Sequence, residues 1–160
     1  MLKIKIVAVG RLKEQYLRDA SAEYEKRLSA FCKLDITELE PEKLPDAPNT
    51  TQINIALEKE ADKIIKAIPQ GSLVCPLCIE GKLISSTELS AKIDSAAISG
   101  NGNICFILGG SYGMSDRVKQ MADLKLSMSP MTFPHQLARI MLLEQIYRSF
   151  KILQGGTYHK

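Results

Sequence analysis

Residues 103–110 read Asn-Ile-Cys-Phe-Ile-Leu-Gly-Gly, an apolar run that ends in two glycines. The run predicts a buried strand from Ile104 to Leu108. Glycine lets a ligand approach the backbone closely, and open α/β sheets bind their ligands at the carboxyl ends of the strands. Gly109 and Gly110 therefore indicate a ligand site directly after this strand. A tight turn from strand to helix explains the two glycines equally well when they are taken alone.

The patterns on both sides of this strand alternate between strands and helices. This alternation is typical of a sheet with mostly parallel strands. We therefore predict an α/β fold, a mostly parallel five-stranded sheet with flanking helices, and the 160 residues are enough for a single domain, residues 1–160. The other predicted strands are residues 2–9, 34–39, 72–79 and 124–128, and the helices are residues 17–31, 51–68, 86–98, 116–122 and 134–153.

Three of the helices are preceded by residues that favour a helix start. Thr50 or Thr51 is expected to cap the second helix. Ser85 has Glu88 three residues further on, which is the spacing of a capping box. Ser115 is expected to cap the short fourth helix. These starts support the predicted order of elements.

The last predicted helix is apolar on nearly all sides. Pro134 suits its first position, and Glu144 and Arg148 are spaced to form an ion pair four residues apart. A sheet covers one side of a helix, so the apolar residues on its other side predict contact with a partner subunit. The apolar residues are Leu137, Ile140, Met141, Leu142, Leu143, Ile146, Tyr147, Phe150 and Leu153.

The composition is that of an ordinary globular protein, with 45% hydrophobic and 24% charged residues. The first residues alternate like a strand rather than a signal peptide, and no apolar run is long enough to span a membrane, so a cytoplasmic location is expected.

Residues 111–160 carry seven Lys or Arg and three Asp or Glu, a surplus of +4. This surplus is compatible with a nucleic-acid partner, and equally with a solvated surface.

Two of the four cysteines form the pattern Cys75-Pro-Leu-Cys78. Such a pair can belong to a thiol-disulfide protein or to half of a zinc site. However, residues three apart on a strand point to opposite faces, and the sequence holds no second close Cys or His pair to complete a metal site. We therefore predict that these cysteines fill the core and that the protein binds no metal.

The motifs of the last third, taken in order, resemble a known family. They are Leu-Gly-Gly-Ser from Leu108, Leu-Ser-Met-Ser-Pro-Met-Thr-Phe-Pro-His from Leu126, and the terminal Tyr-His-Lys. Together they resemble the ribosomal large-subunit methyltransferase H family, a minimal group of SPOUT methyltransferases, along the whole chain. The resemblance implies a trefoil-knotted fold, a homodimer and S-adenosyl-L-methionine as methyl donor. It also implies a substrate, N3 of a pseudouridine in a 23S rRNA stem-loop of the large ribosomal subunit, methylated on the assembled ribosome.

By motif position, the resemblance also implies which residues form the site. Pro76 and Cys78 differ from the family's usual residues beside the donor, and so does Tyr112 in the glycine loop. The implied catalytic residues are His135, Arg139, Tyr158 and His159, although His135 alone is also explained as an ordinary helix-start residue. The implied donor-binding residues are Leu77, Gly109, Met128, Ser129, Pro130, Met131, Thr132 and Phe133.

Other functions remain open from the sequence alone. They are a SPOUT tRNA methyltransferase, a non-catalytic rRNA-binding assembly factor, and a thiol-disulfide protein. The glycines Gly155 and Gly156 predict that the tail after them is mobile until RNA binds. The cations that we expect to contact RNA phosphates are Arg117, Lys119, Arg139, Arg148 and Lys160.

Overall fold

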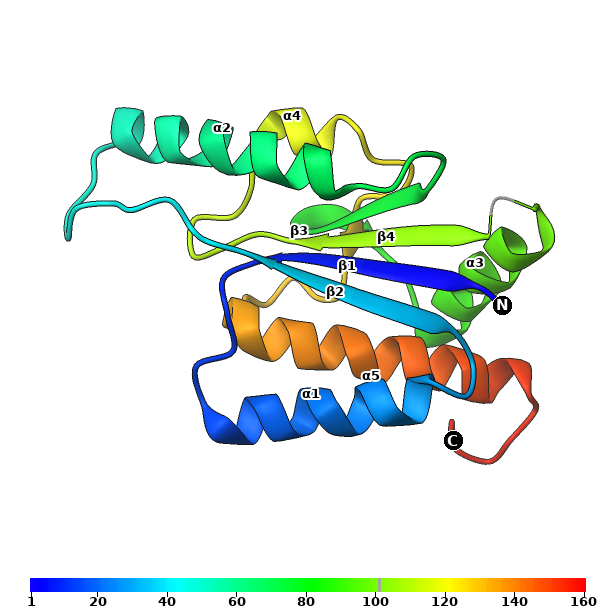
Figure 1. The fold of residues 1–160 in the computed structure, drawn as a ribbon. Coiled ribbons are helices and arrows are strands. Elements are labelled where there is room, and N and C mark those ends of the chain that lie inside the picture. Colours follow the sequence, from blue (N-terminus) through cyan, green and yellow to red (C-terminus); the bar gives the residue numbers. More distant parts are fainter. Residues whose placement is uncertain (101) are drawn as a thin grey trace.

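The structure is a computed structural model, and it describes residues 1–100 and 102–160. Helices and strands alternate along the chain, as the sequence predicts (Figure 1). In chain order they are β1 (Lys3–Val9), α1 (Gln15–Leu28), β2 (Lys33–Leu39), α2 (Thr50–Ala67), β3 (Leu73–Leu83), α3 (Ser86–Ile98), β4 (Asn103–Leu108), α4 (Asp116–Lys119), β5 (Leu126–Ser127) and α5 (His135–Leu153).

The strands form one sheet in the order β2-β1-β4-β3-β5, and every neighbouring pair is parallel. The predicted α/β fold with a parallel five-stranded sheet is therefore confirmed. β4, the strand that ends at the two glycines, lies in the middle between β1 and β3. Because all the strands run the same way, the segments that follow β3, β4 and β5 meet at one edge of the sheet.

Alternate side chains of the central strands enter two separate cores, one on each face of the sheet. Ile6 and Phe106 pack with α1, α3 and α5 on one face, whereas Val7 and Ile107 pack with α2 and α4 on the other. This alternation follows from the period of two residues in a strand. Both faces of the sheet are covered, which explains why β4 is apolar along almost its whole length.

One side of α5 is covered within its own chain. Leu142, Leu143 and Ile146 are fully buried, because α5 lies on the sheet with α1 on one side and α3 on the other. These three residues need no partner subunit, but Ile140, Met141, Tyr147 and Phe150 are only half-buried, so contact of the other side of α5 with a partner stays a prediction. Leu137 and Leu153 remain exposed, with 41% and 43% of their surface accessible.

The start of α2 differs from the predicted one. Asn49, not Thr50 or Thr51, is the capping residue. Its side-chain oxygen accepts a hydrogen bond from the Gln52 amide at 2.8 Å, and the Gln52 side chain accepts one from the Asn49 amide at 2.9 Å. Asn49 therefore starts α2 because it satisfies an otherwise unpaired amide and is itself satisfied in return.

The predicted starts of α3 and α4 are confirmed. Ser85 and Glu88 form the capping box of α3, and the Ser115 hydroxyl accepts a hydrogen bond from the Arg117 amide at the start of α4. Pro134 lies one position earlier than predicted, as the capping residue of α5, because its backbone is extended.

Three elements have different lengths from the predicted ones. β3 continues to Leu83, since its second half pairs with β5. β5 has only two residues, and α4 ends at Lys119. Pairing with a strand distant in sequence sets the length of β3, so periodicity alone could not find it.

Replacing Leu142 with Ala is expected to destabilise the protein by about 2–5 kcal/mol, since it removes a fully buried side chain and leaves a cavity. The matched control is Leu153→Ala on the same helix, where an exposed side chain is shortened. Urea denaturation followed by circular dichroism measures both free energies of unfolding. Equal stability of the two variants would contradict the burial of α5 described above.

Candidate functional site

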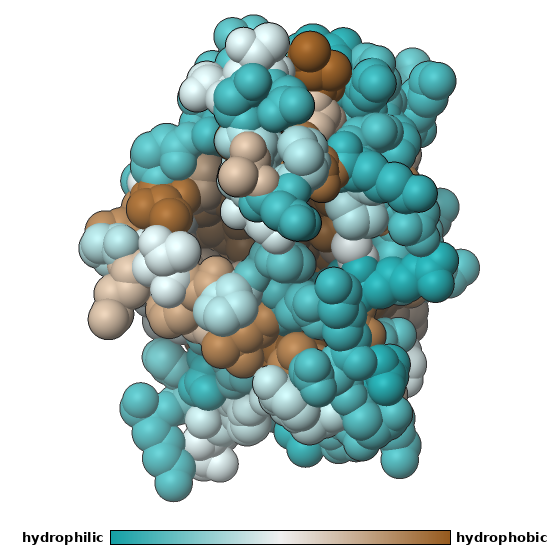
Figure 2. Space-filling view, turned by 90° about the vertical axis from the view of Figure 1, so that its left-hand side faces the viewer, coloured by the Kyte–Doolittle hydropathy of each residue, from teal (hydrophilic) through white to brown (hydrophobic). Residues whose placement is uncertain are grey.

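A cavity of about 640 Å³ opens at the carboxyl edge of the sheet. It is formed by the second half of β3, the loop from β4 to α4, and the segment from β5 into α5. Figure 2 shows a hollow lined largely by hydrophobic residues on the side of the molecule where α5 begins. Both its volume and its apolar walls are those of a small-molecule site.

Seven of the eight predicted donor-binding residues line this one cavity. Pro130 is the exception, and it lies exposed outside the lining. Tyr112 also lies outside the lining and is exposed. The residues brought together are Leu77, Gly109, Met128, Ser129, Met131, Thr132 and Phe133.

Gly109 has a structural reason to be glycine. A Cβ atom at this position would overlap the carbonyl oxygen of Gly113. The amide of Gly113 in turn donates a hydrogen bond to the carbonyl of Gly110 at 3.0 Å. The loop after β4 is therefore a tight turn, and its glycines are needed to close it whether or not a ligand is bound.

The segment between β5 and α5 is held by its own serines. The Ser127 hydroxyl donates to the carbonyl oxygen of Ser129 at 3.1 Å, and the Ser129 hydroxyl accepts from the amide of Met131 at 2.9 Å. These bonds curl the chain and fix the backbone that lines the cavity. This wall of the cavity is therefore shaped before any ligand binds.

The cavity also contains an ion pair that sequence reasoning missed. Glu80 on β3 and Lys119 at the end of α4 both line the cavity, and they form a salt bridge. The hydrogen bond from Lys119 lowers the pKa of the Glu80 carboxyl. Glu80 lies in a run of four consecutive lining residues, from Leu77 to Glu80, where the pairing of β3 with β5 is irregular, so strand periodicity alone does not find it.

His135, the first residue of α5, lies at the cavity. Its side chain is half-buried, and its Nε2 atom lies 3.8 Å from the position that a Cβ atom would take on Gly10. Burial lowers the pKa of the imidazole, and the positive charges of Arg139 and Lys13 lower it further. His135 is therefore a neutral base at neutral pH.

Arg139, one turn further along α5, is not exposed to RNA. Only 3% of its surface is accessible. Its guanidinium pairs with Glu38 at 2.6 Å and donates a hydrogen bond to the carbonyl of Gly10 at 2.9 Å. The expected contact of Arg139 with a phosphate is thus incompatible with its place in the fold. Arg139 instead joins the ends of β1 and β2 to α5.

The sequence predicts a tail that is mobile until RNA binds. In the structure the tail lies against α5. The Tyr158 hydroxyl donates to Glu144 at 3.0 Å, and the Tyr158 ring packs edge-on against Tyr147. His159 contacts Arg148, which forms the predicted ion pair with Glu144 at 2.7 Å.

This docking separates the tail from the cavity. Glu144 lies nine residues after His135 on the same helix, which corresponds to roughly 13 Å along its axis. Within one chain, the structure therefore brings His135 and Arg139 together, and Tyr158 and His159 together, but it does not bring the two pairs to one place.

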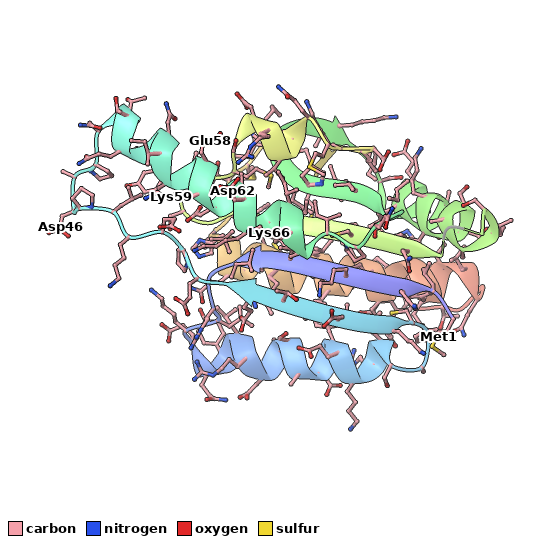
Figure 3. All side chains as sticks on the ribbon, turned by 45° about the horizontal axis from the view of Figure 1, so that its top comes forward. Met1, Asp46, Glu58, Lys59, Asp62 and Lys66 are labelled. Atoms are coloured by element: carbon pink, nitrogen blue, oxygen red, sulfur yellow. The ribbon has the colours of Figure 1, made fainter. Side chains whose placement is uncertain are left out.

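The other cations predicted to contact RNA are mostly neutralised by carboxylates. Arg117 pairs with Glu58 at 3.2 Å and with Asp62 at 2.7 Å, two carboxylates of α2 that Figure 3 labels. Lys119 and Arg148 have the partners described above, whereas Lys160 is exposed. The pairs of Arg117 and Lys119 were invisible to sequence analysis, because their partners are distant along the chain, whereas the pair of Arg148 with Glu144 was predicted.

The cysteines do not form a redox or metal centre. Cys75 is buried in the core, and burial raises the pKa of its thiol to about 12. Cys78 is only partly buried and faces the cavity, so the prediction that it fills the core is wrong; the pKa of its thiol is also raised, chiefly by burial. Both thiols are therefore protonated, which argues against a thiol-disulfide function.

Within residues 1–100 and 102–160 no group of His, Cys, Asp or Glu could hold a metal ion, and none of the described helices could cross a membrane.

Comparison with known proteins identifies the family. A family model described as "Predicted SPOUT methyltransferase" matches residues 2–159. Two solved structures share the fold: a probable methyltransferase from Bordetella pertussis has a TM-score of 0.58 at 12% identity, covering 91% of this chain and 93% of that one. A putative methylase family protein from Neisseria gonorrhoeae has a TM-score of 0.55 at 14% identity, covering 90% of this chain and 81% of that one. The sheet, its cavity and the family match define the class, an α/β methyltransferase of the SPOUT type.

Relatives in sequence place the chain more narrowly. A putative ribosomal RNA large subunit methyltransferase H from Methanococcus maripaludis is 50% identical over 159 residues, covering 99% of this chain and 100% of that protein. A ribosomal RNA large subunit methyltransferase H from Clostridium botulinum has the same identity and coverage. The chain therefore belongs to the SPOUT methyltransferases, and within them to the ribosomal RNA large subunit methyltransferase H family.

The titration of His135 tests its environment. Its midpoint, followed by NMR of the imidazole protons, is expected below the ordinary value of about 6.5, since burial and two nearby cations oppose protonation. The unfolded chain then takes up this proton at a higher pH than the folded protein does. The folded protein therefore becomes less stable as the pH falls below about 6.5, because the unfolded state binds the proton more tightly. His135→Gln should weaken this acid sensitivity. A midpoint above 6.5 would contradict the described environment.

Proposed function

We propose that the protein transfers a methyl group from S-adenosyl-L-methionine to N3 of a pseudouridine in a 23S rRNA stem-loop of the large ribosomal subunit, on the assembled ribosome. The observation that carries the proposal is the cavity at the carboxyl edge of the sheet, lined by residues of all three family motif segments. The names of the 50% identical relatives support the RNA substrate. Such a substrate is found in the cytoplasm, and the loops that form the cavity belong to the trefoil knot implied by the family.

The cavity has the chemistry that the methyl donor requires. Leu77, Met128 and Leu126 offer apolar surface for an adenine ring, and Met131 lies exposed at the margin. The turns at Gly109 and Ser129 bring the backbone to the cavity wall, where polar backbone groups can bind the sugar and amino-acid portions. When bound, the donor supplies an electrophilic methyl group on a positively charged sulfur.

The residues around the cavity align the reaction and accept a proton. Methyl transfer is an in-line displacement, so the protein contributes chiefly by holding the two reactants in position. N3 of a uracil-type base carries a proton that must leave. His135 is the neutral base nearest to the cavity wall, and its imidazole accepts this proton.

The separation of the tail from the cavity supports a homodimer. Tyr158 and His159 lie far from His135 in their own chain, so in the proposed dimer the tail of a second subunit completes the site. One subunit binds the methyl donor, and the other contributes aromatic and basic groups for the RNA. Leu137, exposed near the start of α5, offers apolar surface for this association.

Donor binding is tested by calorimetric titration with S-adenosyl-L-methionine. Leu77→Ala removes apolar contact area and is expected to weaken binding roughly tenfold, or about 1.4 kcal/mol. Gly109→Val is unsuitable, because it would disrupt the turn itself. Leu153→Ala, remote from the cavity, is the control. Equal affinity of both variants would place the donor elsewhere.

The RNA substrate is tested with ribosomes from a strain that lacks the corresponding enzyme. Incubation with the protein and labelled donor is expected to methylate N3 of one 23S rRNA pseudouridine, which mass spectrometry of rRNA fragments identifies. Methylation of tRNA in place of these ribosomes would indicate the alternative substrate, and donor-independent rRNA binding without methylation would indicate an assembly factor.

The role of the tail is tested by truncation after Thr157. Donor affinity should stay within a few-fold, whereas turnover on ribosomes should fall by roughly 10² or more, because positioning or proton-transfer groups are lost. Mixing the truncated protein with full-length His135→Ala distinguishes the origin of the tail. If the tail acts across a dimer, mixed dimers contain one intact site, and about a quarter of the wild-type activity returns. No recovery on mixing would show that each chain uses its own tail.

A further inference from the structure

The loop between β1 and α1, residues 10–14, is attached to α5 beside His135. The carbonyl of Gly10 accepts a hydrogen bond from Arg139, and the amide of Lys13 donates to the side chain of Gln136 at 2.8 Å. Gln136 directly follows His135, and Gly10 lies against the His135 imidazole. The loop therefore borders the cavity, although it lies outside the cavity lining.

The loop is also held from its other side. Arg18 on α1 donates hydrogen bonds to the carbonyls of Leu12 at 3.0 Å and of Lys13 at 2.7 Å. Gly10 has a φ angle of 101°, which a residue with a Cβ adopts only with strain. Both α1 and α5 thus hydrogen-bond to the backbone of this short loop. Lys13 therefore lies on a segment that is held from two sides.

Lys13 differs from several neighbouring cations in that no carboxylate is paired with it among the described residues. Lys119, Arg139 and Arg148 all form ion pairs with carboxylates, as does Arg11 with Glu40 at 2.8 Å. In the part of the chain that the structure describes, no carboxylate pairs with Lys13, and its side chain is exposed. Its positive charge is therefore available to a substrate.

The lowered pKa of His135 agrees with the position of Lys13 that the hydrogen bonds of the loop define. The groups that lower the pKa of His135, after burial, are Arg139 on α5 and Lys13 on the loop. Arg139 is neutralised by Glu38 at the end of β2. The ammonium group of Lys13 is therefore close enough to influence the imidazole, which adjoins the cavity.

We propose that Lys13 is a substrate-contact residue, whose ammonium group binds a backbone phosphate of the RNA next to the methylated nucleotide, and that residues 10–14 form an RNA-binding loop positioned by Arg139. This inference rests on the proposed function. Lysine binds phosphate as a compact charge without base specificity. A phosphate bound here would lie beside His135, so its nucleotide base could reach the cavity mouth.

The test compares Lys13→Gln, Lys13→Arg and a matched control, Lys3→Gln. Lys3 is also exposed but lies at the opposite end of β1, roughly 20 Å away. With unmethylated ribosomes, Lys13→Gln is expected to raise KM roughly tenfold, as the loss of a charged hydrogen bond does, and to leave kcat and donor affinity within a few-fold. The dependence of log KM on log salt should become shallower by about one unit, since one phosphate contact is lost. Lys13→Arg should retain both properties, and Lys3→Gln should behave as the wild type.

A second readout requires no RNA. Lys13→Gln should move the NMR titration midpoint of His135 to higher pH, because a nearby positive charge is removed, whereas Lys3→Gln should not. An active wild type with equal KM and salt dependence in Lys13→Gln and Lys3→Gln would overturn the phosphate contact. An unchanged His135 midpoint in Lys13→Gln would overturn the placement of the charge. A wild type that binds the donor but methylates no rRNA would reject the proposed function, and with it the inference.

Discussion

The burial of α5 between the sheet, α1 and α3 is the interaction on which the rest of the structure depends. Leu142, Leu143 and Ile146 are inaccessible to solvent, and each buried side chain of this size contributes about 1.5–3 kcal/mol. α5 begins immediately after the segment that closes the cavity. The same packing that stabilises the core therefore fixes His135 at the cavity and Arg139 beneath it.

Around this helix, the site is shaped by bonds within the protein. The serines near β5, the turn after β4 and the salt bridge between Glu80 and Lys119 each hold one wall of the cavity. Ion pairing also neutralises most of the cations near the cavity. A site arranged in this way suits the small, partly apolar methyl donor that we propose, and the proposed RNA substrate must then be recognised by groups at its border. Lys13 lies on a loop at this border that α5 holds in place, whereas the tail of the same chain is docked away from the cavity.

Local patterns predicted what local interactions control. The capping box of Ser85 and Glu88 was readable because it lies within four residues. The start of α2 was misassigned among neighbouring polar residues, since Asn49, Thr50 and Thr51 all have suitable side chains and only the hydrogen bonds to Gln52 select Asn49. The parallel α/β fold was predicted from the alternation of helices and strands. The predicted cavity residues other than the glycine turn were found through family resemblance and not through periodicity, and Glu80 and Lys119 were missed.

The sequence by itself determined the class of fold, the buried central strand and the starts of α3 and α4, because hydrophobic periodicity and capping act over a few residues. Only the tertiary structure decided which groups meet. Arg139 and Glu38 lie 101 residues apart in the chain, yet they form a buried ion pair that joins two strand ends to α5. The coverage of α5 by α1 and α3 was decided in the same way, so an all-round apolar helix became a core helix within one chain. Long-range packing makes such contacts, and the patterns of neighbouring residues do not encode their partners.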